Sequence, residues 1–307
     1  MLPYIIIGLD GGGTKTAVRA ADPEGKIIFE RRGGGMNYNT IPMDVAVKNA
    51  AECILPLPEA ERYIVSIAHP SADDGFVSPL VEEFSRRLSK LLPEPNEIII
   101  KSDVYMALYA LSRGKSGIMI IGGTGSIGVA MDSNGGVHTV GGWGYPTNDE
   151  GSAYSIAVEG IKLVFDAFDG TGKPTPLTEK ALKLFEAEDT RSLIDIFNAK
   201  DVSRAFVARF AVCVSKLADS GNEDCAEILI NAAHSLSRYA AALAKKVPGA
   251  KIVGMTGGVL KNSDIVRNMF IKDVSTMFPE MEIRLLTTPP EQGAIYYAID
   301  TMKGEIG

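Results

Sequence analysis

The stretch Ile5–Thr16, Ile-Ile-Ile-Gly-Leu-Asp-Gly-Gly-Gly-Thr-Lys-Thr, restricts the fold of this chain more than any other. Its β-branched start has the length and apolar character of a buried strand. Backbone without a Cβ can approach a ligand closely, and successive N–H groups in such a turn form a concave anion site. Asp10 at the strand's end can hold a cation, directly or through its waters. The same residues could form a tight β-turn without a ligand, but the acid and the threonines favour a phosphate site for a Mg-nucleotide.

Composition narrows the class of protein. The 307 residues suffice for two domains with a substantial core, and 46% hydrophobic with 22% charged residues is typical of soluble globular chains. The net charge is −7 and no Lys/Arg run is long enough for a nucleic-acid or membrane-surface partner. The apolar stretch Tyr4–Gly8 is too short for a signal peptide, and no run approaches bilayer-spanning length. Three scattered cysteines without a CxxC motif, Cys53, Cys213 and Cys225, predict reduced thiols in a cytoplasmic protein.

The residues after the glycine loop predict a hairpin. A second strand at Thr16–Ala21 leads through the turn Asp22-Pro23-Glu24-Gly25 into a third strand at Lys26–Glu30. The loop therefore joins strand to strand. The P-loop pattern GxxxxGK[ST] is excluded because Thr14 follows Gly13 and because the required helix is missing.

The opening pattern returns 110 residues later. The apolar run Ile118–Ile121 precedes the second glycine loop Gly122–Ser126, and the two hairpins align without gaps. The residues that align identically are Gly12, Gly13, Thr14, Ala20, Asp22 and Gly25 with Gly122, Gly123, Thr124, Ala130, Asp132 and Gly135. A matched strand–loop–strand–turn–strand unit predicts two homologous halves. The dinucleotide pattern Gly123-x-Gly125-x-x-Gly128 is rejected, because a hairpin continues where a helix is needed.

The rest of the chain predicts an α/β protein of two domains. Helical spacing covers 43–54, 76–92, 103–112, 152–165, 176–186, 189–198, 201–219, 222–246 and 291–302, and further strands are expected at 62–68, 97–101, 251–255 and 282–286. We expect an N-terminal domain at 1–115 and a C-terminal domain at 116–307 with a helical insertion at about 152–247. The last helix, about 291–307, is expected to pack back onto the first domain.

These motifs, in this order, resemble the actin, hsp70 and sugar-kinase ATPase superfamily. Within it the chain looks like the N-acetylglucosamine kinase branch, which it shares with the BadF-type ATPases. The motifs are Asp10–Thr16, Asp103, Gly122–Ser126, Gly142-Trp143-Gly144, Asp149–Ala153, Thr256–Val259 and Pro290–Ala294. The resemblance implies two ribonuclease-H-like domains with an interdomain cleft for ATP and Mg²⁺, whose closure excludes water.

The resemblance also assigns catalytic and metal-binding roles. Asp103 would be the general base that takes the proton of the sugar hydroxyl, which phosphoryl transfer requires. Its alternative role is a helix N-cap together with Ser102. Asp10 would bind Mg²⁺, through water.

For the nucleotide, the resemblance implies two phosphate loops and a nucleoside loop. The implied contact residues are Gly12, Gly13, Thr14, Lys15, Thr124, Gly125, Gly257 and Gly258. The polar side chains could instead make hairpin-turn hydrogen bonds, and Lys15 could be solvated. Gly257 and Gly258 could be a plain strand-to-helix turn.

For the sugar, the implied contact residues are Asn37, Asp103, Ser126, Gly142, Trp143, Gly144 and Asp149. Asn37 could simply form a turn, and a single tryptophan is usually core. Two positions depart from the family pattern: His69 replaces a small residue, and Ile127 replaces an asparagine of the animal enzymes. These changes put the specificity for an N-acetyl group in question. His69 and Ser71 could help to hold a plain hexose or a sugar acid. Alternatively, the loop that carries them could simply be packed differently.

The resulting prediction is an ATP-dependent kinase of a small-molecule hexose or amino sugar, of the N-acetylglucosamine or glucose type. A sugar-acid kinase, such as one for 2-keto-3-deoxygluconate, is the alternative. A rival of another class is an activase-type ATPase acting on a partner enzyme, which the Trp-Gly and Asp-Glu-Gly-Ser signatures disfavour. The helical block 176–247 is a candidate surface for a homodimer.

Overall fold

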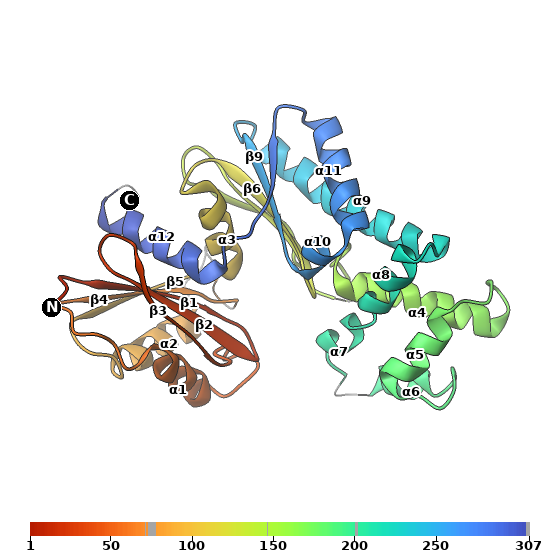
Figure 1. Cartoon of the computed structure of the whole chain (residues 1–307), viewed down its shortest axis with the longest axis horizontal. Helices are drawn as coiled ribbons and strands as arrows, with labels where there is room; N and C mark the ends of the chain where they lie inside the picture. The colour runs from red at the N-terminus through yellow and green to blue at the C-terminus, as the bar shows by residue number, and fades with distance from the viewer. Residues whose placement is uncertain (71, 73–77, 146, 200–201, 305–307) are drawn as a thin grey trace. The chain divides into compact units, whose positions relative to one another are not determined.

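The computed structural model describes residues 1–70, 72, 78–145, 147–199 and 202–304 (Figure 1). The chain divides into two compact units. The first contains Met1–Gly117, the turn Ser133–Val137 and the segment from Leu286 onward, and the second contains Ile118–Asp132 and His138–Leu285. The first unit is therefore discontinuous, because its final helix follows the whole of the second unit in the sequence.

The sheet of the first unit has the strand order β3-β2-β1-β4-β5. The strands are β1 Ile5–Gly11, β2 Lys15–Ala21, β3 Ile27–Gly34, β4 Tyr63–Ala68 and β5 Asn96–Lys101. β1, β2 and β3 pair antiparallel, whereas β1, β4 and β5 pair parallel. Gly11 pairs with Thr16 at the end of the first ladder, so the glycine loop joins two strands as predicted.

Alternate residues of β1 serve two different cores, because successive side chains of a strand point to opposite faces. Ile5, Ile7 and Leu9 pack into the cluster that includes residues of α1 (Met43–Ile54) and α2 (Pro79–Ser89). Ile6 packs with Ile295 of α12 (Pro290–Met302). Figure 1 shows α1 and α2 on one side of this sheet and α12 on the other.

The helix α12 lies very close to the sheet and to α3 (Asp103–Ser112). A Cβ on Gly8 would lie 2.0 Å from the carbonyl oxygen of Glu291, and one on Gly293 would lie 2.5 Å from the carbonyl oxygen of Met106. Both glycines are therefore required by close approach of backbone. This packing brings the first turn of α12 to the end of β1, where Asp10 lies.

The sheet of the second unit repeats the same order, β10-β9-β6-β7-β8. Its strands are β6 Gly117–Gly122, β7 Ser126–Met131, β8 Val137–Gly141, β9 Ile252–Thr256 and β10 Glu282–Leu285. β6 pairs parallel with β9, and β9 with β10. In chain order both sheets read third, second, first, fourth, fifth, which confirms the predicted pair of ribonuclease-H-like domains.

The helices of the second unit are α4 Ala153–Asp169, α5 Leu177–Phe185, α6 Leu193–Asn198, α7 Arg204–Ala208, α8 Ala211–Asp219, α9 Glu223–Lys246, α10 Gly258–Asn262 and α11 Asp264–Met277. The single helix predicted at 201–219 is wrong, because α7 and α8 are separated at Arg209 and Phe210. Phe210 is fully buried, so the break directs its ring into the core. α11 was not predicted, and α10 was expected only under the alternative that Gly257 and Gly258 form a strand-to-helix turn. Among the described residues, no helix is long and apolar enough to cross a membrane.

Candidate active site

In the first unit, the structure places Asp10 near two further carboxylates. Asp10 is on β1 and faces the same side as Ile6 and Gly8, toward α12. Burial, together with the charges of Asp103 and Glu291, raises the pKa of its carboxyl to about 7, and Lys15 opposes this shift in part. A carboxylate destabilised in this way is a natural partner for a cation, which would restore the ionised form.

Asp103 is the first residue of α3, and the helix cap is its neighbour Ser102. The Ser102 hydroxyl accepts a hydrogen bond from the backbone N–H of Tyr105 at 3.1 Å. The Asp103 carboxylate accepts the N–H of Val104 at 2.8 Å. Since Ser102 caps the helix, the alternative role of Asp103 as the N-cap is not needed to explain this acid.

The first glycine loop is bonded to the loop that carries Asn37. The carbonyl oxygen of Gly12 accepts the N–H groups of Met36 at 3.0 Å and of Asn37 at 3.2 Å. A Cβ on Gly35 would lie 2.2 Å from the carbonyl oxygen of Gly13, so the two loops touch through backbone. Gly12 itself has open space where a Cβ would point, and Thr14 and Lys15 are exposed. The loop is thus supported from one side and accessible from the other.

His69 does not reach the surface where a sugar could meet it. Its side chain is 0% exposed, and its Nε2 lies 3.1 Å from the carbonyl oxygen of Met36. Its ring stacks on Tyr38 with centroids 4.5 Å apart. The suggestion that His69 contacts the substrate is therefore wrong, and the suggestion about Ser71 falls outside the described residues.

In the second unit, the predicted phosphate and nucleoside loops line one pocket of about 680 Å³. Gly123 and Thr124 come from the loop after β6, and Gly258 and Val259 begin α10. Further walls come from α4, α7, α8 and α10 with Ala153, Ile156, Ala208, Arg209, Val212, Ser215, Lys216 and Asn262. A pocket of this size, with apolar walls and a few polar and cationic groups, suits a small organic ligand.

The two glycines of the nucleoside loop have different surroundings. Gly257 has φ +94°, and a Cβ there would lie 2.3 Å from the carbonyl oxygen of Gly122. A Cβ on Gly258 would meet only the Asn262 side chain, at 3.9 Å. Gly257 is therefore required by the fold, whereas the absence of a side chain at Gly258 keeps the pocket open. Gly125 is close-packed too, because a Cβ there would lie 2.7 Å from a carboxylate oxygen of Asp149.

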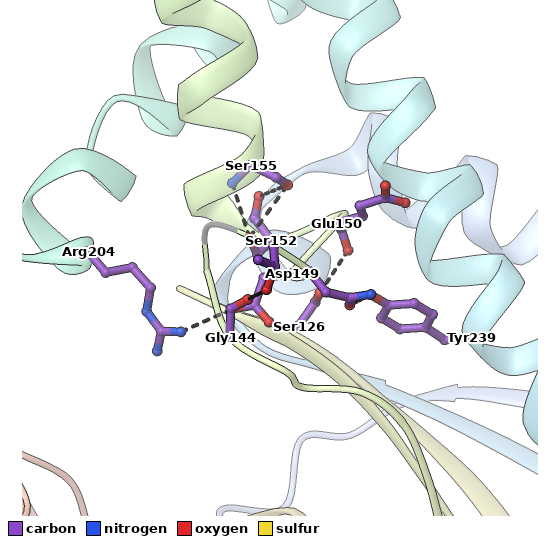
Figure 2. A network of polar contacts seen from close by, with 10 residues as sticks. Ser126, Gly144, Asp149, Glu150, Ser152, Ser155, Arg204 and Tyr239 are labelled. Carbon is purple, nitrogen blue, oxygen red and sulfur yellow. Dashed lines mark hydrogen bonds and ion pairs between the residues drawn. The ribbon is translucent and has the colours of Figure 1, made fainter.

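Asp149 lies at the centre of a polar network beside the second glycine loop (Figure 2). Its carboxylate accepts a hydrogen bond from Arg204 of α7 at 3.0 Å, and the backbone N–H groups of Ser126 and Gly144 donate to it as well. Burial raises the pKa of Asp149, and these donors only partly offset that effect. The Ser126 hydroxyl donates to the carbonyl oxygen of Glu150 at 2.7 Å.

Trp143 belongs to a loop that is tied to this network without being buried by it. Gly142 and Gly144 on either side have positive φ of 72° and 88°. The indole side chain is 81% exposed, so Trp143 is not a core residue within its unit. A large apolar side chain held at the surface by a hydrogen-bonded loop is available for a ligand.

Three residues of these clusters were not predicted: Glu291, Met36 and Arg204. Glu291 was quoted within its motif but received no role, and only the close packing of α12 on β1 brings it to Asp10. Met36 gives no polar signal, because its backbone makes the contacts. Arg204 lies 55 positions from Asp149, and no spacing rule relates the two.

Comparison with known proteins places the whole chain in one group. The profile of the BadF/BadG/BcrA/BcrD ATPase family matches residues 7–298. An N-acetylmuramic acid/N-acetylglucosamine kinase of Clostridium acetobutylicum is 27% identical over 95% of this chain and 97% of its own length. An N-acetyl-D-glucosamine kinase of Dictyostelium discoideum is 27% identical over 99% of this chain and all of its own length.

The fold also has close relatives among solved structures. A Chromobacterium violaceum protein, described as a candidate N-acetylglucosamine kinase, superposes with a TM-score of 0.76. It is 22% identical, and the match covers 95% of this chain and 97% of the other. The two-domain fold inferred from the sequence is therefore also the fold of that protein.

Proposed function

Because the chain belongs to the BadF/BadG/BcrA/BcrD ATPase family, we propose that it transfers the γ-phosphoryl group of ATP to a hydroxyl of an amino sugar of the N-acetylglucosamine class. The observation that carries this proposal is the pocket in which Gly123-Thr124 and Gly258-Val259 come together. Two relatives that match almost the full chain are kinases of such sugars, which supports the acceptor class.

In this proposal, the pocket of the second unit binds the nucleoside, and the two glycine loops bind the phosphates. Gly258 and Val259 lie against adenine and ribose. The exposed side chains of Thr14, Lys15 and Thr124, with the backbone N–H groups of Gly13 and Gly125, are the proposed donors to the phosphate oxygens. The N–H groups of Gly12 and Gly123 already donate within their own turns, to the carbonyl oxygens of Lys15 and Gly125. Arg209 and Lys216 at the pocket wall add positive charge for an anionic ligand, which Asp219 at the same wall offsets in part.

Asp103 acts as general base, and Asp10 would hold Mg²⁺. Magnesium keeps several of its waters, so one carboxylate and the phosphates suffice to bind it. Among the described residues no group of three acidic, histidine or cysteine side chains is arranged for a metal. When bound, the ion offsets the negative charge of the phosphates. Asp103 takes the hydroxyl proton and orients the oxygen for in-line attack.

Asn37, Trp143 and Asp149 are proposed to hold the sugar, together with Ser126, Gly142 and Gly144. Asp149 is already bonded to Arg204, so the acid meets sugar hydroxyls from a fixed position. Arg204 also favours a second candidate, a sugar that carries a carboxylate. Its side chain is 37% exposed beside the proposed sugar site, where a guanidinium can pair with an anionic substituent.

Two further assignments, the location and the oligomeric state, are proposals. We place the protein in the cytoplasm because Cys53, Cys213 and Cys225 are all free thiols. We propose a homodimer formed through the helical insertion, where Phe168 and Ile194 expose large apolar side chains.

A coupled assay of ADP release over hexoses, N-acylated amino sugars and sugar acids tests this function. We expect sugar-dependent turnover with an N-acetylated amino sugar. Asp103→Asn should lower kcat by a factor of about 10² to 10⁴, the usual range for a general base, and leave the KM for ATP unchanged. Because Ser102 caps α3, this variant should fold normally. ATP turnover that no sugar stimulates would instead support an activase.

A further inference from the structure

One residue, Met36, links three parts of the first unit. Its N–H donates to the carbonyl oxygen of Gly12 at 3.0 Å, and its own carbonyl oxygen lies 3.1 Å from Nε2 of His69. Its side chain is 0% exposed and fills the space beside Gly11, where a Cβ would lie 2.3 Å from the methionine Cγ. The next residue is Asn37, which also donates its N–H to Gly12. A single peptide segment thus connects the first phosphate loop, the Asn37 loop and His69.

His69 is itself held in place from several directions. Its N–H donates to the carbonyl oxygen of Lys101 at the end of β5, at 2.9 Å. Its ring stacks on Tyr38 and lies 5.6 Å from the fully buried ring of Phe84. A carbonyl oxygen only accepts, so Nε2 carries the hydrogen of the bond to Met36.

Electrostatics keeps this histidine neutral. Burial lowers the pKa of His69, and the bond to the Met36 carbonyl opposes that effect only in part. Around neutral pH, His69 is therefore a fixed hydrogen-bond donor without charge. The neutral imidazole can donate to the carbonyl oxygen of Met36, the residue before the proposed sugar contact Asn37.

We propose that His69 is a positioning residue, which acts through Met36 to hold the Asn37 loop and the first phosphate loop in one fixed arrangement. This inference rests on the proposed function, because it assigns Asn37 to the sugar and the Gly12 loop to the phosphates. In-line transfer depends on the relative placement of hydroxyl and phosphorus, and displacement by about 1 Å is costly. The bond from His69 fixes both loops relative to β4 and β5.

The competing explanation is that His69 only fills space between Tyr38 and Phe84. Three substitutions separate these roles. His69→Gln places an amide N–H near the Nε2 position and keeps the bond to Met36. His69→Asn is equally polar but shorter, so it does not reach the carbonyl. His69→Phe keeps the stacked ring and loses the donor.

The experiment combines steady-state kinetics with amide hydrogen exchange of peptides that cover residues 34–41, measured on the whole protein without ligands. We expect His69→Asn and His69→Phe to raise the KM for the sugar about tenfold, the effect of leaving a buried acceptor unpaired. The KM for ATP should change less than twofold. Exchange at Met36 and Asn37 should be faster in both variants, and His69→Gln should restore most of both properties.

Two results would overturn the inference. One is a sugar KM within twofold of the wild type in both His69→Asn and His69→Phe. The other is His69→Gln behaving like His69→Asn in kinetics and in exchange. If the wild type phosphorylates no sugar, the proposed function fails first, and exchange alone then decides: unchanged exchange at Met36 in the variants rejects His69 as a positioning residue. If His69→Phe does not fold, the matched Gln and Asn variants still decide.

Discussion

At the scale of the residue, the neighbouring glycines Gly257 and Gly258 have different roles, one in folding and one in ligand binding. Gly257 has positive φ and touches the backbone of Gly122, whereas Gly258 has free space on the pocket side. The sequence alone predicts that both glycines belong to one nucleoside-binding loop. Only the backbone around each glycine shows that the first maintains the fold and the second leaves room for a ligand.

Gly258→Val should therefore damage binding and spare stability. The added methyl groups enter the proposed nucleoside pocket, and the nearest protein atom to its Cβ is 3.9 Å away. We expect the KM for ATP to rise about tenfold or more, while the midpoint of urea unfolding stays near the wild type. Gly249→Val is a matched control, because Gly249 has nothing within 4 Å and lies outside the pocket. Equal ATP affinity in the two variants would place the nucleoside elsewhere.

Asp10→Asn should stabilise the protein while it abolishes activity. The pKa of Asp10 is raised to about 7 in the folded chain, against about 4 when unfolded. The folded state therefore loses stability as pH rises from about 4 to about 7, because it must then hold a disfavoured charge. Asparagine carries no such charge. Urea unfolding should show the variant as more stable at pH 8, with the difference vanishing near pH 4; a variant less stable at pH 8 contradicts this reasoning.

The residues that sequence reasoning found and those it missed differ in a physical way. Asp10 is the second-last residue of β1 and Asp103 is the first residue of α3, so the local sequence pattern marks both. Glu291 and Arg204 owe their places to packing between elements distant in the chain, which no local pattern encodes. The burial of His69 depends likewise on Tyr38 and Phe84 from other segments.

At the scale of the element, the repeated hairpin was the most informative signal. Its apolar strands, glycine loop and turn recur together in the sequence, and both sheets have the same strand order. α10 was not predictable in the same way, because it has five residues and starts at glycine without a side-chain cap. α11 does have signals, the cap Ser263 and the buried spacing Val266, Phe270 and Val274, and these were overlooked.

The contact between α3 and α12 depends on a buried carboxylate, Asp300. Its carboxylate accepts a hydrogen bond from the Tyr109 hydroxyl at 2.7 Å. It also accepts hydrogen bonds from Nη2 and Nε of Arg113, at 2.8 and 3.1 Å. Burial opposes its ionisation, but these donors together prevail and lower the pKa of Asp300. Arg113 has φ +51°, a strained conformation for a residue with a side chain, and this ion pair holds it.

Asp300→Asn should destabilise the first unit by about 2 kcal/mol at pH 7, because it breaks a partly buried charge pair. A carboxyl with a lowered folded pKa contributes stability above its unfolded pKa of about 4 and loses it below. The difference between wild type and variant in urea unfolding should therefore shrink as pH falls below 4. Tyr109→Phe, which removes one donor and leaves Arg113 in place, should cost less. Equal losses in the two variants would count against the dominant role of the charge pair.

At the scale of the whole molecule, the first unit depends on a segment that returns from far along the chain. α12 supplies Ile295 and Ala298 to the core behind β1 and β4, and it carries Glu291 to Asp10. The second unit has its own core, centred on β6, β9 and the long helix α9. Each unit is therefore expected to respond separately to damage in its own core.

Gly8→Ala tests this separation. Its methyl group would lie 2.0 Å from the backbone oxygen of Glu291, so α12 must move away from the sheet. We expect a loss of about 3 kcal/mol, the upper range for overpacking, together with loss of activity. Amide exchange should accelerate in β1, β4 and α12 and stay unchanged in α9. Faster exchange throughout α9 would show that the two units unfold as one.

The dependence of β1 on α12 also sets an order of assembly during synthesis. The ribosome makes all of residues 118–285 after the N-terminal strands and before α12. At ordinary elongation rates that interval lasts roughly 10–30 s. Throughout it the nascent sheet has one apolar face uncovered, and Asp10 has no Glu291 beside it. The carboxylate cluster around Asp10 is therefore completed only after α12 has been synthesised and has packed onto the sheet.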